Sequence, residues 1–462
     1  MTPFEMPAHE IARRVAAGEI SARAVTEALL ARIAARNPAL NAFTDVTAER
    51  AMREADAVDA KRRRGEPLGP LAGVPYAVKN LFDIAGLPTR AGSKINRDLP
   101  PARRDSFLGR KLAAADAVCL GGLNMGEYAY DFTGENAHDG ASRNPHDPER
   151  MTGGSSGGSG GAVAAGMAPF ALGSDTNGSI RVPAALCGIF GLKPTFGRLS
   201  RAGTFPFVAA FDHLGPLARS AKDLALAYDA MQGADPDDPA QSPRTLDPTV
   251  AALERGASGL RIAVAGGYFA KGGEPAAFEA VARVAAALKA EREVAFPEAH
   301  RARAAAYTIT TVEGAQLHEA RLRERAGDFD PATRDRLLAG LMVPAAWYVK
   351  AQRFRSWYAR EVAKLFDDVD IVLAPATPCG APKIGQQTMT IDGQEMLVRP
   401  NLGLFTQPIS FIGLPVVAVP IHAPGALPLG VQIVAAPWRE DLALRVAFEL
   451  ERMGVARAPV AG

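Results

Sequence analysis

Short apolar runs alternate with longer amphipathic segments along most of the chain. Seven of these runs have the length and apolar composition of buried strands, and they lie at residues 74–78, 117–120, 170–172, 261–265, 371–375, 415–420 and 431–434. Strands that alternate with helical segments are typical of a sheet covered by helices. We therefore predict an α/β fold, in which a large mixed β-sheet is flanked by helices on both faces (α/β/α).

The segments between these runs show helical periodicity. In the first helical layer, residues 7–64, Ser21 is a suitable N-cap for a helix that places Val25, Leu29 and Ile33 on one face. The remaining predicted helices lie at residues 107–116, 158–166, 221–231, 276–292, 301–366 and 440–453.

The chain is expected to form a single domain over residues 1–462. After the helical layer of residues 1–64, residues 65–232 form the core segment that carries the motifs described below. Residues 233–258 are predicted to form a surface loop, because residues 233–249 are rich in aspartate and proline. Residues 259–462 are expected to complete the sheet, with the helical segment at about 301–366 on its outside.

Composition and charge exclude several classes of function. The net charge of +2 gives no electrostatic reason to expect a nucleic acid as partner. The three cysteines are far apart in sequence, which favours a reducing compartment over a disulfide framework. Neither a metal-binding pattern nor a cofactor motif is present, and no run is long enough to predict a signal peptide or a membrane span. We expect a cytoplasmic protein without metal or cofactor.

Two glycine- and serine-rich segments, residues 151–161 and 173–183, are the most informative part of the sequence. A flexible linker has this composition, but here the first segment leads into a small, apolar stretch that belongs in a core. A Walker-type phosphate loop would need a lysine before its final serine or threonine, and none is present. A serine within a concave turn of backbone N–H groups is the third interpretation, and it indicates nucleophilic chemistry.

The spacing and residues of these segments resemble the amidase signature family. Ser155 lies in the Gly-Gly-Ser-Ser run, and Ser179 lies 24 positions later in Asp-Thr-Asn-Gly-Ser-Ile-Arg. Lys79 follows Gly-Val-Pro and an apolar run, and it matches the catalytic lysine of the family. Asn177 is a departure, because the family usually has glycine there. The resemblance implies the amidase signature fold.

The resemblance also implies a Ser-Ser-Lys mechanism. Ser179 would attack the amide carbon, Ser155 would pass the proton, and Lys79 would accept it. A lysine can do this only when it is uncharged, which requires burial without a carboxylate partner. The backbone N–H groups of Thr176, Asn177, Gly178 and Ser179 would form the oxyanion hole. The resemblance assigns support of the loops to Ser156, Asp175 and Arg181.

Resemblance to one branch of the family also implies a substrate and partners. Residues 198–207 and 211–213 resemble the branch of the family that releases ammonia from small carboxylated ureido compounds of the carboxybiuret type, often with a small helical accessory subunit. Met125 and Tyr128 match a segment that borders the substrate pocket. Arg143, Arg181 and Arg201 are candidates for binding a substrate carboxylate, and the sequence does not select one. The expected partners are a small amide substrate, water, and either a second copy of the chain or a small accessory protein.

Three alternatives remain open at this point. The first is the glutamine-hydrolysing component of a tRNA-dependent amidotransferase, and the second is a general aliphatic or aryl amidase. The third is a protein that binds a ligand through the glycine-rich loop without catalysis.

Overall fold

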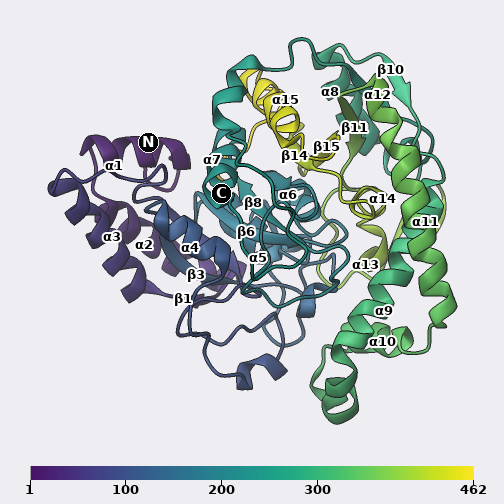
Figure 1. The fold of residues 1–462 in the computed structure, drawn as a ribbon, viewed down its shortest axis with the longest axis horizontal. Coiled ribbons are helices and arrows are strands. Elements are labelled where there is room, and N and C mark those ends of the chain that lie inside the picture. The colour runs from purple at the N-terminus through teal and green to yellow at the C-terminus, as the bar shows by residue number, and fades with distance from the viewer. Residues whose placement is uncertain (1, 462) are drawn as a thin grey trace.

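The computed structural model describes residues 2–461, and its centre is one eleven-stranded sheet (Figure 1). The strands of this sheet, in chain order, are β1 (Phe43–Val46), β2 (Pro75–Lys79), β3 (Val118–Leu123), β6 (Phe170–Asp175), β7 (Phe190–Lys193), β8 (His213–Ala218), β9 (Ile262–Ala265), β10 (Arg292–Val294), β11 (Ile371–Pro375), β14 (Val416–Ile421) and β15 (Leu429–Ala435). All seven predicted strands are present.

The sheet is mixed, and both halves of the chain contribute to it. Its order is β1-β3-β2-β6-β8-β7-β14-β15-β11-β9-β10. The strands from β3 through β2 to β6 are parallel, those from β6 to β11 alternate in direction, and β11, β9 and β10 are parallel again. The prediction of a large mixed sheet in an α/β fold is therefore confirmed.

Helices cover both faces of the sheet. The helices of the first half are α1 (Ala8–Ala17), α2 (Ala22–Leu40), α3 (Ala48–Arg63), α4 (Phe107–Ala114), α5 (Gly157–Ala164), α6 (Arg181–Leu186) and α7 (Ala221–Met231). Those of the second half are α8 (Pro275–Leu288), α9 (Ala299–Arg325), α10 (Pro331–Gly340), α11 (Ala345–Ala363), α12 (Leu365–Asp368), α13 (Val398–Asn401), α14 (Gln407–Ser410) and α15 (Glu440–Arg452). Ser21 caps α2, as predicted, because its side chain accepts the N–H of Ala24.

Several predicted boundaries are wrong. The N-terminal helical layer contains strand β1, which pairs with β3 at the edge of the sheet. The helix predicted to reach residue 292 ends at Leu288, where Lys289 adopts φ 56°, and β10 follows. The helical segment at 301–366 is divided between α9, α10 and α11, which form the right-hand layer in Figure 1. These errors arise at short strands and turns, which have little periodicity of their own.

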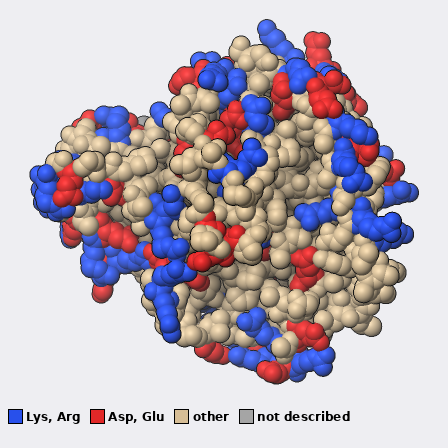
Figure 2. Space-filling view, in the orientation of Figure 1, with Lys and Arg blue, Asp and Glu red and all other residues tan. Residues whose placement is uncertain are grey.

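Several smaller elements lie outside this core. Two hairpins, β4 (Arg143–Asn144) with β5 (Asp147–Met151) and β12 (Thr388–Ile391) with β13 (Gln394–Leu397), lie outside the main sheet. The predicted loop 233–258 includes a short 3₁₀ helix, Val250–Arg255. Figure 2 shows basic and acidic side chains interspersed over the face in view, in line with the net charge of +2. Across residues 2–461, no helix has the length and apolar character needed to cross a membrane.

The first helix, α1, is tied to the core by a buried carboxylate on α7. Asp223 accepts hydrogen bonds from the backbone N–H groups of Ala8, at 2.8 Å, and His9, at 2.9 Å. Asp223 is almost fully buried, so these donors are satisfied far from water. The start of α1 is therefore fixed to α7 across more than two hundred residues of sequence.

We expect Asp223→Ala to lower the free energy of unfolding by about 2–3 kcal/mol, because it leaves buried N–H groups without acceptors. Urea unfolding followed by circular dichroism measures this. Asp56→Ala removes a carboxylate whose pair with Arg23 is exposed on both sides, and it should cost less than about 0.5 kcal/mol. Equal effects of the two substitutions would contradict the role given to Asp223.

Candidate active site

Strand β2 places Lys79 at the centre of the candidate site. This strand lies between β3 and β6, and every one of its residues is buried. Lys79 is its last residue, and its side chain is 0% exposed. The side-chain nitrogen Nζ donates to Ser155 Oγ at 2.6 Å and to Ser174 Oγ at 2.8 Å. The amine is therefore held by two hydroxyl groups, from the glycine-rich run and from β6.

Burial dominates the electrostatics of this amine. Removal from water disfavours the charged form and lowers the pKa of Lys79 from 10.5 to about 7, although the more distant Asp212, Asp175 and Asp131 act in the opposite direction. Among residues 2–461, no carboxylate forms an ion pair with it. A substantial fraction of Lys79 is consequently uncharged at neutral pH.

Each of the three carboxylates is engaged elsewhere. Asp175 pairs with Arg181 at 2.9 Å, and Asp131 pairs with Arg399. Asp212 accepts the hydroxyl of Thr176 at 2.6 Å and the backbone N–H groups of residues 207 and 208. These contacts use the oxygens that would otherwise attract a lysine.

The glycine-rich run brings Ser155 to the lysine and then starts α5. The Gly154–Ser155 peptide bond is cis, and Gly153 before it has φ 78°. Gly158 lies so close to Asn124 that a Cβ atom would meet the backbone nitrogen at 2.5 Å. The neighbouring Ser156 joins this run to β6, because its Oγ donates to Ser174 O at 3.2 Å. Glycines are therefore needed for close packing, and the linker interpretation is wrong.

The turn between β6 and α6 carries the second serine. Gly178 has φ 144°, and a Cβ atom there would clash with Thr406 Oγ1. Thr406 Oγ1 in turn donates to Asn177 O at 2.6 Å, which fixes the turn from the far side. Over residues 2–461, the backbone N–H groups of residues 176–179 donate no hydrogen bond within the chain. Four free donors in one turn can hold an anionic oxygen.

Asp175 and Arg181 brace this turn at its two ends. Arg181 is 0% exposed, and its Nε and Nη2 donate to the two oxygens of Asp175, both at 2.9 Å. It also donates to Gln432 Oε1 at 2.6 Å and to the backbone of Thr406. Arg181 is therefore occupied on all sides. The structure leaves it no free donor pair for a substrate carboxylate.

A cavity opens on the side of Ser179. We call it the Ser179 cavity; its lining residues are Ala129, Tyr130, Asp131, Phe132, Thr176, Asn177, Ser179, Phe207, Tyr307, Thr310, Arg336 and Gln407. Asn177, the residue that departs from the family pattern, lines it and donates to Thr310 Oγ1 at 2.9 Å. The asparagine side chain therefore forms part of the cavity wall and does not block the turn.

Arg336 is the cation of this cavity that has no acidic partner. Its guanidinium lies over the ring of Tyr130, with Cζ 3.8 Å from the ring centroid, and Nε donates to Ala332 O at 2.7 Å. Nη2 donates to Tyr130 O. In the part of the chain that the structure describes, it forms no ion pair, and its Nη1 donates no hydrogen bond. A planar cation with a free donor can bind a carboxylate.

A second cavity, here the Ser174 cavity, approaches the lysine from another side. Ser174 and Asp212 lie in its lining, and Arg201 lines it while pairing with Asp238 at 3.1 Å. Of the cavity residues, Ala129 and Phe207 line both cavities. Arg201 is thus near the site, but a carboxylate already holds it.

The other predicted pocket residues lie elsewhere. Met125 and Tyr128 are buried beneath the site, and Tyr128 donates its hydroxyl to Asn96 Oδ1 at 3.1 Å. Arg143 is exposed on strand β4 and donates to Pro148 O at 2.9 Å. None of the three lines either cavity. Their assignment to substrate contact is therefore not supported by the geometry.

Sequence reasoning missed Ser174 and Arg336. Ser174 directly precedes Asp175, and the parallel pairing of β2 with β6 brings its side chain to Lys79. Successive side chains of a strand point to opposite faces of the sheet. This alternation, applied to residues 170–175, could have identified Ser174. Arg336 lies in α10, more than 150 residues from Ser179, and no local signal connects the two.

The geometry supports neither a serine activated by histidine nor a metal site. His213, which pairs with Asp175 across β8 and β6, has Nδ1 at 3.0 Å from Asp175 O, and burial holds its pKa well below the usual value. Within residues 2–461, no serine hydroxyl contacts it. The same residues contain no cluster of three or more His, Cys, Asp or Glu arranged for a metal ion.

The chain belongs to the amidase family. The family described as Amidase matches residues 24–444, which is most of the chain. Its members hydrolyse carbon–nitrogen bonds other than peptide bonds, and a Ser-Ser-Lys triad is typical of the family.

Similarity to particular members extends over nearly the whole chain. The AtzE chain of the 1-carboxybiuret hydrolase of Pseudomonas sp. (strain ADP) is 57% identical over 451 residues, which cover 97% of this chain and 98% of that protein. A chain of the glutamyl-tRNA(Gln) amidotransferase of Azotobacter vinelandii (strain DJ / ATCC BAA-1303) is 38% identical, with 96% of each chain covered.

Solved structures show the same similarity. An inhibitor-bound structure, described as a vestigial protein complex that reveals the origins of an s-triazine catabolic enzyme, has a TM-score of 0.97 and 56% identity, and it covers 98% of this chain and 100% of that one. A bacterial aryl acylamidase of the amidase signature family has a TM-score of 0.89 at 27% identity, with coverage of 98% and 97%. The predicted amidase signature fold is confirmed.

The lowered pKa of Lys79 predicts a pH-dependent effect of Lys79→Met on stability. Between pH 7 and pH 10.5 the unfolded chain binds the proton that the folded chain has released, so the wild type gains stability as pH rises through this window. The Met variant has no such gain. Its free energy of unfolding, compared with that of the wild type, should therefore be more favourable at pH 7 than at pH 10. Urea unfolding at both pH values measures the difference.

The exposed Lys350 supplies the control for this experiment. Lys350→Met should change the free energy of unfolding by the same small amount at both pH values. A Lys79→Met effect that is equally independent of pH would mean that Lys79 stays a cation in the folded protein.

Proposed function

We propose that this protein is an amidohydrolase that releases ammonia from a small linear amide through a serine acyl-enzyme, with Ser179, Ser155 and Lys79 as catalytic residues. The observation that carries the proposal is the buried, carboxylate-free amine of Lys79 at 2.6 Å from Ser155 Oγ. An amine with a pKa of about 7 is suited to take up and return a proton at neutral pH.

In the proposed first step, Ser179 Oγ forms a bond to the amide carbon. Its proton passes to Ser155, whose own proton passes to Lys79. The carbon–nitrogen bond then breaks, and the same path returns a proton to the nitrogen, which leaves as ammonia. Water, deprotonated along this path, attacks the ester in the second step and frees Ser179.

The proposed oxyanion hole is the turn of residues 176–179, whose backbone N–H groups donate no hydrogen bond to any of residues 2–461. Loss of one such donor typically costs about 3 kcal/mol of transition-state stabilisation. Ser156, Asp175 and Arg181 have the supporting role of holding this turn and the Ser155 loop against the sheet. Their buried contacts support that assignment.

For the substrate we propose a carboxylated ureido compound of the 1-carboxybiuret type. The 57% identity to a chain of a 1-carboxybiuret hydrolase supports this choice. Arg336 supports it independently, because it lines the Ser179 cavity and its Nη1 donates no hydrogen bond within residues 2–461. Arg336 replaces Arg143, Arg181 and Arg201 as the proposed carboxylate-binding residue. Glutamine, the substrate expected for the tRNA-dependent amidotransferase alternative, also has a carboxylate and is the second candidate.

We also propose that a small accessory protein binds this chain and that the location is cytoplasmic. The similar structure described as a protein complex supports the first proposal. Three free, buried cysteines support a reducing compartment.

Covalent labelling tests the catalytic assignment. A fluorophosphonate should modify the wild type at Ser179, which mass spectrometry of the peptide identifies. Ser179→Ala should abolish labelling, and Lys79→Ala should slow it at least about 100-fold, because the proton acceptor is lost. Labelling of another serine, or a Lys79→Ala rate within about three-fold of the wild type, would contradict the mechanism.

Steady-state kinetics with paired substrates test the binding role of Arg336. Arg336→Ala should raise KM for 1-carboxybiuret about 30- to 100-fold, the loss expected for a charge-assisted hydrogen bond. The variant should leave KM for biuret, which has no carboxylate, within about two-fold. Arg143→Ala, at the exposed β4 position, is the control and should change neither. Faster turnover of glutamine than of 1-carboxybiuret by the wild type would overturn the substrate choice.

A further inference from the structure

We propose that Glu127 is a positioning residue: it bridges the loop of residues 127–138 to the start of α10 and so holds Arg336 in the Ser179 cavity. This inference rests on the proposed role of Arg336 and adds a residue that determines substrate preference without touching substrate. Glu127 does not line the cavity.

The contacts of Glu127 lie between two distant segments. Its Oε2 accepts the backbone N–H of Asp330 at 2.8 Å, across 203 residues of sequence. Its Oε1 lies 3.0 Å from His138 Nε2, at the other end of its own loop. The side chain is 1% exposed, so water does not replace either contact. A single buried carboxyl group thus joins both ends of the loop to the residue that starts α10.

Asp330 continues this bridge into α10. One of its carboxylate oxygens accepts the N–H of Ala332 at 2.9 Å, which caps the helix, and the other accepts the N–H of Ala137 at 3.0 Å. Arg336 lies on the second turn of the same short helix. A shift of this N-terminus therefore moves the guanidinium directly, because only about one and a half turns separate them.

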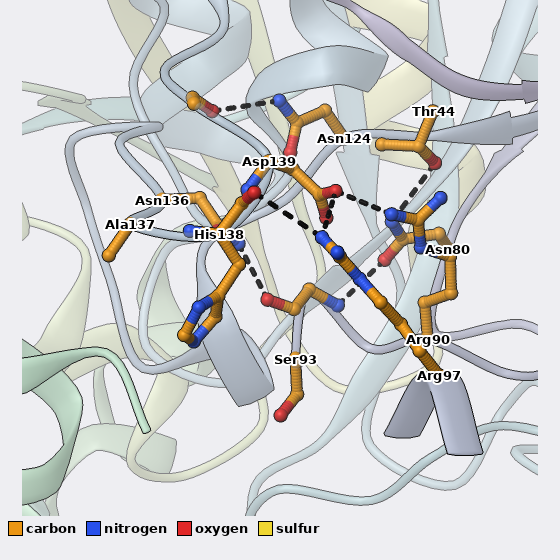
Figure 3. A network of polar contacts seen from close by, with 12 residues as sticks. Thr44, Asn80, Arg90, Ser93, Arg97, Asn124, Asn136, Ala137, His138 and Asp139 are labelled. Carbon is orange, nitrogen blue, oxygen red and sulfur yellow. Dashed lines mark hydrogen bonds and ion pairs between the residues drawn. The ribbon is translucent and has the colours of Figure 1, made fainter. Parts of the chain in front are cut away.

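The loop itself is held rigidly beside its anchor. Asn136 donates to Gly92 O at 2.7 Å and to Met125 O at 2.8 Å, and its Oδ1 accepts the N–H groups of residues 138 and 139. In Figure 3 the ring of His138 extends away from Asp139 and its arginine partners. His138 is thereby directed to Glu127 and not to the surface cluster of Arg90 and Arg97.

Arg336 contacts the same loop at its other side. It donates to Tyr130 O and lies over the Tyr130 ring. Between Glu127 and Tyr130 the backbone has two consecutive non-glycine residues with positive φ, Tyr128 at 49° and Ala129 at 61°. Such a conformation persists only where neighbouring contacts determine it. The Glu127 bridge and the Arg336 contact enclose this strained pair, so loss of the bridge would release it.

The protonation states indicate which substitution preserves the bridge. Burial raises the pKa of Glu127 to about 8 and lowers the pKa of His138. Both shifts favour the uncharged forms, in which a carboxylic O–H can donate to His138 Nε2 while the other oxygen accepts the N–H of Asp330. A glutamine has the same shape, one acceptor oxygen and a donor N–H group. Glu127→Gln should therefore preserve the bridge, whereas Glu127→Ala removes it.

The test uses full-length protein, with 1-carboxybiuret and biuret as substrates at pH 7. Glu127→Ala should raise KM for 1-carboxybiuret about ten-fold, with kcat and the KM for biuret within about three-fold of wild type. Glu127→Gln should remain within about three-fold of wild type in every parameter. In an Arg336→Ala background, Glu127→Ala should cause no further rise in KM, because both act through one guanidinium.

Asp330→Asn keeps the test decisive if Glu127→Ala does not fold. Its amide can still cap α10 but presents an N–H group where Ala137 donates, so it breaks the link between loop and helix. The same selective rise in KM is expected. Equal losses with both substrates, additivity with Arg336→Ala, or no effect of either variant would overturn the role of Glu127.

These outcomes differ from a failure of the proposed function. If Arg336→Ala itself leaves KM for 1-carboxybiuret unchanged, the carboxylate assignment is wrong. If Arg336→Ala has its expected effect while Glu127→Ala and Asp330→Asn do not, the positioning role alone is wrong.

Discussion

The site depends on one constraint, the burial of a lysine amine without a neutralising carboxylate. Charge is expensive to remove from water, and a buried lysine must either find an anion or lose its proton. Lys79 is surrounded by hydroxyl groups, and the nearby aspartates are bound to arginine, hydroxyl and backbone donors. The fold therefore yields an amine that exchanges a proton near neutral pH, the property that the proposed mechanism requires.

Arg181 contributes to this constraint although it takes no part in the proposed reaction. It neutralises Asp175, the last residue of strand β6, which also supplies Ser174. Without this pairing, Asp175 would be a free buried anion near the lysine and would favour its charged form. The same ion pair closes the turn that carries Ser179. One contact thus supports both the electrostatics of Lys79 and the geometry of the turn.

Much of the fold and part of the site could be predicted from the sequence. Apolar runs located β2, β6 and the late strands, and the glycine-rich motifs identified Ser155 and Ser179 as neighbours of Lys79 in function. The short strands β1 and β10 were missed because three or four residues carry no clear periodicity. Arg336 and Glu127 could not be found, since their importance arises from contacts between segments some 200 residues apart. Arg143 looked suitable by charge and sequence position, yet β4 directs it to solvent.

The central claim concerns the protonation state of one amine, and NMR measures it directly. Spectra of protein labelled with ¹³C at the lysine Cε position, compared with the same spectra of Lys79→Met, would isolate the Lys79 resonance during a pH titration. The account predicts a midpoint near pH 7. A midpoint near 10.5, the value of a lysine in water, would show a permanent cation and would contradict the account.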